Sequence, residues 1–204
     1  MRAKEEYTVR RTGLFNDETL FFYTYTAQNG MVFNTEGKDL DTCRKSRDKW
    51  QSHLSASFTG HRGVTDIHKT AERLRTAIME CYNSGMRFFY IGGAVGFDTI
   101  AAEAVLHFRE QFPDIVLIVV VPFPEQDKFF NVKSRKRYRE ILDKADEIVT
   151  ISNEFSKVAY LMRNDYMVSH SCRVIAYWDG VSGSGTSYTV REAKKRKKSV
   201  QNLF

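Results

Sequence analysis

The chain has 204 residues, of which 42% are hydrophobic, and a formal net charge of +6. This length favours one domain with an appendage, and this apolar content is enough for a folded core, which excludes wholesale disorder. The longest apolar run, Ile115–Val121, has seven residues, whereas a membrane-spanning helix needs about 20, so we expect no membrane partner.

The amino-terminal sequence MRAKEEYTVR lacks the apolar stretch of a secretory signal. The three cysteines, Cys43, Cys81 and Cys172, are far apart, which argues against a disulfide framework and against a cysteine metal site. Together these features predict a cytoplasmic protein.

Positive charge is concentrated in residues 194–198 (KKRKK), without which the net charge falls to +1. These residues end the last expected helix, where the helix dipole favours cations, so a solvated helix end is the preferred interpretation. A nucleic-acid contact is the alternative, and nucleic acid is therefore a less favoured partner.

The first 53 residues predict a small module that is separate from the rest of the chain. Residues 1–17 are polar and predict an irregular segment. Phe21–Ala27 and Met31–Thr35 flank an Asn-Gly pair and predict a β-hairpin with a primed turn. A helix is expected over Asp39–Ser52, with a stripe facing the hairpin that contains Leu40, Cys43, Arg47 and Trp50. This ββα module is too small for a large core, so we expect it to pack on the rest of the chain or on a partner.

From residue 54 to residue 204 strand patterns alternate with helical patterns, which predicts an α/β domain with a mostly parallel sheet and helices on both faces. The expected strands are Leu54–Phe58, Phe88–Ile91, Ile115–Val121, Glu147–Ile151, Arg173–Trp178 and Ser199–Leu203. The expected helices are Asp66–Ser84, Asp98–Gln111, Lys133–Lys144, Ala159–Ser171 and Ser187–Lys197. In the first helix the core face is expected to contain Ile67, Ala71, Leu74, Ile78 and Cys81.

A glycine-rich turn, Gly92-Gly93-Ala94-Val95-Gly96, joins an expected strand to the following helix. Such a corner points backbone N–H groups outward at the positive end of a helix and is typical of phosphate binding. The glycine spacing differs from the dinucleotide fingerprint, so NAD is disfavoured and no cofactor is predicted. Asp98 is interpreted either as a partner of a ribose hydroxyl or as the cap of its own helix.

A second turn of this kind runs from Asp179 to Thr186 and contains Gly180, Gly183, Ser184 and Gly185. Its small residues let a ligand approach the backbone, and its hydroxyls add hydrogen-bond donors; a flexible linker is the weaker alternative. Because carboxyl ends of parallel strands meet at one edge, the two turns predict one anion pocket.

Three further segments end at the same expected edge. Thr59-Gly60-His61-Arg62 offers a tight turn, hydrogen-bonding side chains and a guanidinium for phosphate or carboxylate, although an ordinary polar turn is equally compatible. Arg163, beside Asn164, is interpreted as a phosphate partner or as one half of a surface salt bridge. Phe123, after Pro122, either stacks on a base or packs against a neighbouring helix.

Four short segments together resemble the YpsA-like branch of the SLOG superfamily, which is named for DprA-like and Lonely Guy members. They are residues 58–62 (FTGHR), 92–98 (GGAVGFD), 163–168 (RNDYMV) and 179–190, with its Asp-Gly, Gly-Thr and Tyr-Thr-Val elements. The resemblance covers about residues 54–203. It implies a Rossmann-like sheet that binds a nucleotide or nucleotide-derived ligand, with a sensing or regulatory role, and it is compatible with a homodimer.

The candidate ligand-binding residues are Thr59, Gly60, His61, Arg62, Gly92, Gly93, Gly96, Phe97, Asp98, Pro122, Phe123, Arg163, Asn164, Asp179, Gly180, Gly183, Ser184, Gly185 and Thr186. The sequence has no nucleophile elbow, Walker lysine, metal-ligand cluster or evident acid/base pair, so no metal is predicted and enzymatic activity stays open.

Two alternatives follow from the resemblance. Lonely Guy enzymes cleave the N-glycosidic bond of nucleoside 5′-monophosphates with a glutamate three residues after a Gly-Thr pair. Here Gly185-Thr186 matches that pair, Thr189 stands in the glutamate position, and Glu192 is a weak substitute one helical turn further. If the protein is an enzyme, this hydrolase activity is the expected one. The other alternative is DprA-like binding of single-stranded DNA, suggested by the 96–98 turn and the basic residues 194–198.

Overall fold

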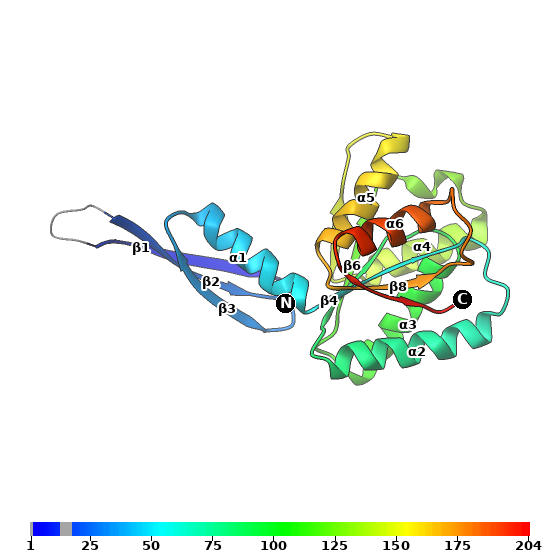
Figure 1. Ribbon diagram of the computed structural model, residues 1–204, viewed down its shortest axis with the longest axis horizontal. Helices are drawn as coiled ribbons and strands as arrows, with labels where there is room; N and C mark the ends of the chain where they lie inside the picture. The colour runs from blue at the N-terminus through cyan, green and yellow to red at the C-terminus, as the bar shows by residue number, and fades with distance from the viewer. Residues whose placement is uncertain (1, 13–17) are drawn as a thin grey trace.

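The computed structural model describes residues 2–12 and 18–204 and contains two sheets (Figure 1). A three-stranded antiparallel sheet has the order β1-β2-β3, and a six-stranded sheet has the order β7-β6-β5-β4-β8-β9. Every neighbouring pair in the larger sheet is parallel. The α/β architecture expected from the sequence is therefore confirmed.

The small sheet and its helix comprise β1 (Lys4–Thr12), β2 (Glu18–Thr26), β3 (Val32–Gly37) and α1 (Leu40–His53). The parallel sheet comprises β4 (Ser55–Gly60), β5 (Phe88–Ile91), β6 (Val116–Val121), β7 (Glu147–Thr150), β8 (Arg173–Tyr177) and β9 (Ser199–Asn202). Its helices are α2 (Ile67–Asn83), α3 (Phe97–Gln111), α4 (Val132–Lys144), α5 (Lys157–Ser169) and α6 (Gly185–Lys195), with a short 3-10 helix η1 (Gln126–Phe129).

Helices cover both faces of the parallel sheet, and Figure 1 shows α2 below it and α5 and α6 above it. Successive side chains of each strand point to opposite faces of the sheet, so both faces need to be covered. Phe89 and Leu117 belong to the core formed with α2, α3 and α4, whereas Phe88 and Ile118 belong to a second core on the opposite face. The central strand β6 is buried along its whole length, as a parallel strand covered on both faces requires.

Local signals set the ends of α2 as expected. The Asp66 side chain accepts a hydrogen bond from the Lys69 backbone N–H at 2.9 Å, and Gly85 follows the helix with a φ of +89°. One predicted core residue is wrong: Ile67, the first residue of α2, is 58% exposed. None of the described helices combines the length and the apolar character needed to cross a membrane.

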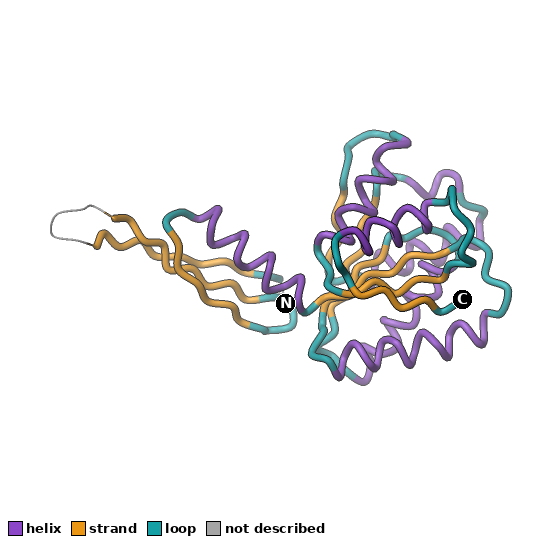
Figure 2. Tube along the Cα trace, in the orientation of Figure 1, coloured by secondary structure: helices purple, strands orange, loops and turns teal. Residues whose placement is uncertain are grey.

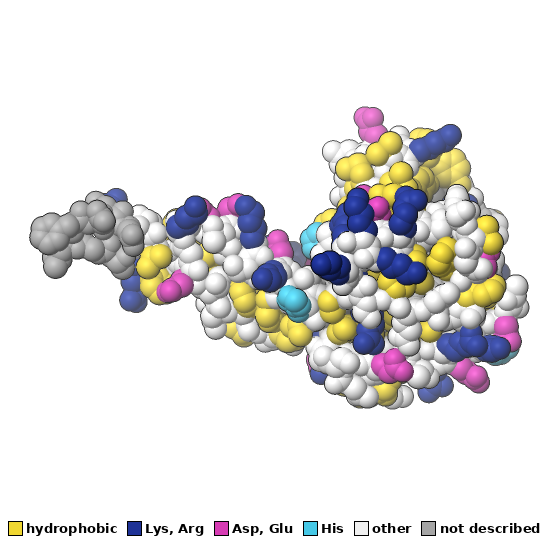
Figure 3. Space-filling model, in the orientation of Figure 1, with side chains coloured by type: hydrophobic (Ala, Val, Ile, Leu, Met, Phe, Trp, Pro, Cys, Tyr) yellow, Lys and Arg dark blue, Asp and Glu magenta, His cyan; other side chains and the backbone are white. Residues whose placement is uncertain are grey.

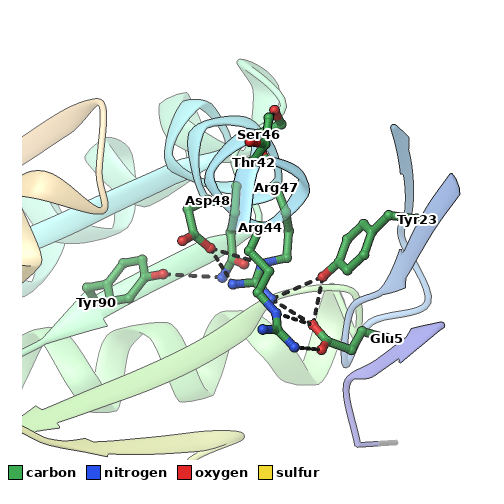
Figure 4. A network of polar contacts seen from close by, with 9 residues as sticks. Glu5, Tyr23, Thr42, Arg44, Ser46, Arg47, Asp48 and Tyr90 are labelled. Atoms are coloured by element: carbon green, nitrogen blue, oxygen red, sulfur yellow. Dashed lines mark hydrogen bonds and ion pairs between the residues drawn. The ribbon is translucent and has the colours of Figure 1, made fainter. Parts of the chain in front are cut away.

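The N-terminal module contains a strand that the sequence pattern missed. Residues 4–12 were expected to be irregular, but they form β1, which pairs with β2 in register, Tyr7 opposite Tyr23; residues 1 and 13–17 lie outside the described part. Glu5 of β1 has three partners (Figure 4): it accepts from the Tyr23 hydroxyl at 2.9 Å and pairs with Arg44 and Arg47 of α1. These contacts fasten β1 to the helix.

The hairpin between β2 and β3 is confirmed, but the primed turn is wrong. Gly30 is the turn residue with positive φ, at +84°, whereas a primed turn of the Asn-Gly type also needs positive φ at Asn29. The Ala27 carbonyl accepts from the Gly30 N–H at 3.0 Å, and the Ala27 N–H donates to the Met31 carbonyl at 2.8 Å. The connection is therefore a three-residue loop ending in a left-handed glycine.

The module packs on the domain at the amino ends of the parallel strands, and Figure 2 shows it projecting from that end. The Asn29 side chain donates to the Asp114 carbonyl at 2.8 Å, just before β6, and Gln28 donates to Glu147 at the start of β7. The Trp50 indole packs edge-on against Phe88 with ring centroids 6.2 Å apart. The module is thus attached opposite the edge where the glycine turns lie.

Candidate functional site

A cavity of about 340 Å³ lies at the carboxyl edge of the parallel sheet, within the range of small-molecule sites. It is bounded by the end of β4 and the loop that follows it, by the turn before α3, and by residues of α3, α5 and the start of α6. The candidate residues that line it are Thr59, Gly60, His61, Arg62, Asp98, Arg163, Asn164, Ser184, Gly185 and Thr186. The tertiary structure therefore brings the three predicted turns and the helix that contains Arg163 to one cavity.

The amino end of α6 supplies backbone donors to this cavity. The Ser184 hydroxyl caps the helix by accepting from the Ser187 N–H at 3.1 Å, so this hydroxyl is already engaged. The N–H groups of Gly185 and Thr186 have no partner inside the helix, because the first helical turn has none to offer. With the helix dipole, these N–H groups make this end of α6 favourable for an anion.

The turn at residues 92–96 is tightly packed. A Cβ on Gly92 would lie 2.2 Å from Nη1 of Arg163, and a Cβ on Gly96 would lie 2.2 Å from the Arg62 carbonyl oxygen. Gly96 also has a φ of +93°, which favours glycine. These glycines permit close packing between the turn, the β4 loop and α5, and it is Ala94 of this turn that lines the cavity.

Two oppositely charged side chains are buried beside this turn. Asp98 accepts from the Ala94 N–H at 3.2 Å, so its carboxylate fixes the turn before α3 and does not form the predicted cap of that helix. Burial raises the pKa of Asp98 to about 6, although the Arg163 guanidinium acts in the opposite direction. The cavity thus contains a carboxyl group that titrates at mildly acidic pH.

Arg163 is buried, so the surface salt bridge considered from the sequence is wrong. Its Nη1 donates to the Gly92 carbonyl and its Nε donates to Asn164 Oδ1 at 2.8 Å. Burial lowers the pKa of Arg163, and the charge of Asp98 opposes that effect. Arg163 therefore holds α5 against the first glycine turn while it lines the cavity.

Arg62 is the exposed cation of the site. Within residues 2–12 and 18–204 its guanidinium has no hydrogen-bond or ion-pair partner. The neighbouring His61 joins two turns, because its Nε2 lies 2.9 Å from Asp179 Oδ1. The pKa of Asp179 is lowered mainly by the hydrogen bond from the Val181 N–H and further by His61. The contact between His61 and Asp179 thus ties the turn after β4 to the turn after β8.

Several candidate residues do not line the cavity. Phe97 is fully buried and stacks on Tyr177 with centroids 5.6 Å apart, so its side chain belongs to the core. Phe123 is buried and packs edge-on against Tyr160 of α5 at 5.3 Å, which agrees with the packing alternative. The others outside the lining are Gly92, Gly93, Gly96, Pro122, Asp179, Gly180 and Gly183.

The hydrolase alternative gains no support from the site. Glu192 lies outside the cavity lining, and Thr189 is buried with its hydroxyl donating to the Gly185 carbonyl at 2.9 Å. Asp98 is the carboxylate among the lining residues. In the described part of the chain no group of three His, Cys, Asp or Glu side chains could hold a metal ion.

Sequence reasoning missed Tyr160 and Leu161, which line the cavity from the first turns of α5. A signal was present, because the helix after β7 begins at the same sheet edge as the glycine turns. Its first residues were therefore positioned to face the site, as was predicted for Arg163 and Asn164.

The fold and site define a Rossmann-like α/β protein with a cavity lined by polar and charged side chains at the carboxyl edge of its sheet. Residues 60–203 match the family described as YspA SLOG, and the chain belongs to that family. The resemblance noted in the sequence is thereby confirmed.

Relatives of similar size support this assignment. The chain is 34% identical over 150 residues to UPF0398 protein BH1768 of Halalkalibacterium halodurans, covering 72% of this chain and 78% of the relative. It is 33% identical over 140 residues to the uncharacterized SPbeta prophage-derived protein YoqJ of Bacillus subtilis, covering 62% and 81%.

Solved structures with a similar fold are DNA processing protein A, DprA, from two bacteria. The Streptococcus pneumoniae protein superimposes with a TM-score of 0.54 at 18% identity, covering 74% of this chain and 50% of that protein. The Helicobacter pylori protein, described for its single-stranded DNA binding mode, gives 0.54 at 19% identity and covers 97% and 80%. At this identity the likeness shows the fold.

Proposed function

We propose that this protein binds a nucleotide or nucleotide-derived ligand in the cavity at the carboxyl edge, as a sensing or regulatory module. The observation that supports this most is the convergence of an open helix end and a free guanidinium, from Gly185, Thr186 and Arg62, on one cavity. A phosphate group fits that donor set, because it accepts backbone N–H groups and pairs with a guanidinium through two parallel hydrogen bonds.

Hydroxyl-bearing parts of the ligand have partners deeper in the cavity. Asp98 can accept from a ribose hydroxyl through the oxygen that does not bind the Ala94 N–H. Thr59 and Thr186 line the cavity, and within the described residues their hydroxyls make no hydrogen bond to the protein. These hydroxyls are therefore available to pair with polar groups of a ligand.

Calorimetric titration with a panel of nucleoside monophosphates, nucleoside diphosphates and ADP-ribose tests the proposal. Arg62→Ala should weaken the tightest ligand by about tenfold or more, because a charge-assisted hydrogen bond contributes roughly 1.5–3 kcal/mol. Its fold should be unchanged, since the side chain is exposed and unpaired within the described residues.

The matched control is Arg75→Ala, which removes the same charge from an exposed position of α2 outside the cavity. This variant should bind like the wild type. No binding of any panel member, or equal weakening by both variants, would refute a phosphate site at Arg62.

Single-stranded DNA binding is the second candidate, and the DprA folds favour it. Figure 3 shows Lys and Arg side chains gathered over the end of α6, where residues 194–198 lie. DNA binding there should weaken steeply with salt, and the slope should flatten when the five cations are neutralised. Absent or salt-independent binding would exclude this function.

A further inference from the structure

A second cavity, of about 530 Å³, lies directly beside the first and is bounded by the loop after β6, the start of α4 and the start of α5. The two cavities share Arg62, Ala94 and Tyr160. A ligand that enters the first cavity can therefore extend into the second without leaving the protein surface.

The walls of this second cavity are largely aromatic. Phe129, Phe130, Phe155 and Tyr160 line it, and the centroids of Phe129 and Phe155 lie 5.9 Å apart with their planes 53° apart. Phe155 is supported from behind by the buried Phe123, edge-on at 5.2 Å. The Phe155 ring is thus held in place by a buried neighbour, and Phe129 packs against Phe155.

Two of these rings are unusually exposed. Phe129 is 72% exposed and Phe155 is 59% exposed, and exposed aromatic side chains that cluster together are typical of a binding surface. Figure 3 shows further hydrophobic side chains near the start of α5, where Val158 and Met162 lie. Exposed aromatic faces beside a polar anion site are typical of a ligand with one charged end and one flat apolar end.

Resting on the proposed function, we infer that the second cavity holds the nucleobase of the ligand, whose phosphate lies in the first cavity. The ligand class is then a nucleoside phosphate and not a simple sugar phosphate. A base stacks on aromatic rings through its π face, which all four bases have. Phe129 and Phe155 could therefore stack on any base.

Arg62 connects the two parts of this site, because it lines both cavities and has no competing partner within the described residues. A guanidinium pairs with phosphate through its edge and stacks on flat rings through its face. The buried Gln126 and the exposed Asn131 provide polar groups on the wall of the second cavity, where the edge of a base would lie.

Calorimetry on the full chain with AMP, GMP, CMP and UMP against ribose 5-phosphate tests the inference. The preferred nucleotide should bind at least tenfold more tightly than ribose 5-phosphate. Phe129→Ala should weaken that nucleotide five- to tenfold and leave the ribose 5-phosphate affinity within twofold, while Phe129→Trp should retain binding. Phe204→Ala removes another exposed ring, outside both cavities, and should change neither affinity.

The outcomes separate the two proposals. If the wild-type protein binds none of the nucleotides and no ribose 5-phosphate, both the phosphate site and this inference are overturned. Equal affinities for ribose 5-phosphate and the nucleotides, both sensitive to Arg62→Ala and insensitive to Phe129→Ala, leave the phosphate site standing and overturn the base site. A change of molecular mass in sedimentation equilibrium on Phe129→Ala, with nucleotide affinity unchanged, identifies the aromatic surface as a self-association interface and likewise overturns it.

Discussion

The two glycine turns look alike in the sequence but differ physically. At residues 92–96 a Cβ on Gly92, Gly93 or Gly96 would lie within 2.9 Å of another atom, whereas a Cβ on Gly180 or Gly183 would have no atom within 4 Å. Glycine in the first turn permits close packing, and glycine in the second leaves the backbone open to solvent. A glycine-rich turn can therefore either pack against the rest of the site or expose its backbone to a ligand. The spacing of the glycines alone does not distinguish these two roles.

The largest expected effect is that of Gly96→Ala. The new Cβ would meet the Arg62 carbonyl, which is backbone and cannot rotate away, and the φ of +93° adds strain. We expect the free energy of unfolding to fall by roughly 3 kcal/mol or more, measured by urea denaturation.

The matched control is Gly183→Ala, which has a similar φ of +90° but open surroundings. It should cost about 1–2 kcal/mol, the strain alone. Equal losses in the two variants would mean that the first turn is not packed as described, and the contrast between the turns would disappear.

Asp98 gives the next largest effect, and it depends on pH. Its pKa is raised from 3.8 to about 6 in the folded protein, so the folded state binds more protons between these values. Protonation of Asp98 therefore adds to the free energy of unfolding, by at most about 3 kcal/mol. This contribution is complete below about pH 4 and is lost as the pH rises through 6. In Asp98→Asn this contribution to the pH dependence should be absent.

Urea denaturation of both proteins from pH 4 to pH 7 measures this difference. The variant should gain stability relative to the wild type as the pH rises. A difference between the two proteins that stays constant over this range would show that the carboxylate is solvated and that the first turn is looser than its contacts indicate.

The smallest effect is expected at the open turn, for Gly185→Ala. The new Cβ would lie 3.9 Å from Asn164 Nδ2, an ordinary contact, and the position does not have a positive φ. The free energy of unfolding should change by less than about 0.5 kcal/mol. Nucleotide affinity measured by calorimetry should fall, because the methyl group would project beside the proposed phosphate; an unchanged affinity would place the ligand elsewhere.

Much of the domain could be predicted from local patterns. Strand β5 is found at the predicted residues, Phe88–Ile91, and the other strands and the helices lie within about two residues of their predicted ends. These elements depend on contiguous apolar runs, helical periodicity and capping residues, which are all visible in a short window. The strand β1 was missed because its pattern is polar, and its Glu5 is stabilised by Arg44 and Arg47, about 40 residues further along the chain.

The candidate site was predictable in outline. Thr59, Arg62, Asp98, Asn164 and Thr186 follow from one rule, that parallel strands bring their carboxyl ends to a common edge. Side-chain depth did not follow from that rule. Phe97 belongs to the same motif as Asp98, but its side chain is buried in the core. The aromatic cavity beside the site is lined by Phe129 and Phe155, which belong to no common sequence motif.

The sequence by itself determined the alternation of strands and helices, the positions of the glycine corners and the family to which they belong. Only the tertiary structure decided which corner is packed and which is open, because that depends on contacts such as the one between Arg163 and the Gly92 carbonyl, 71 residues apart. Local patterns report the conformation that each segment prefers, whereas the atoms that a side chain meets are set by the whole fold.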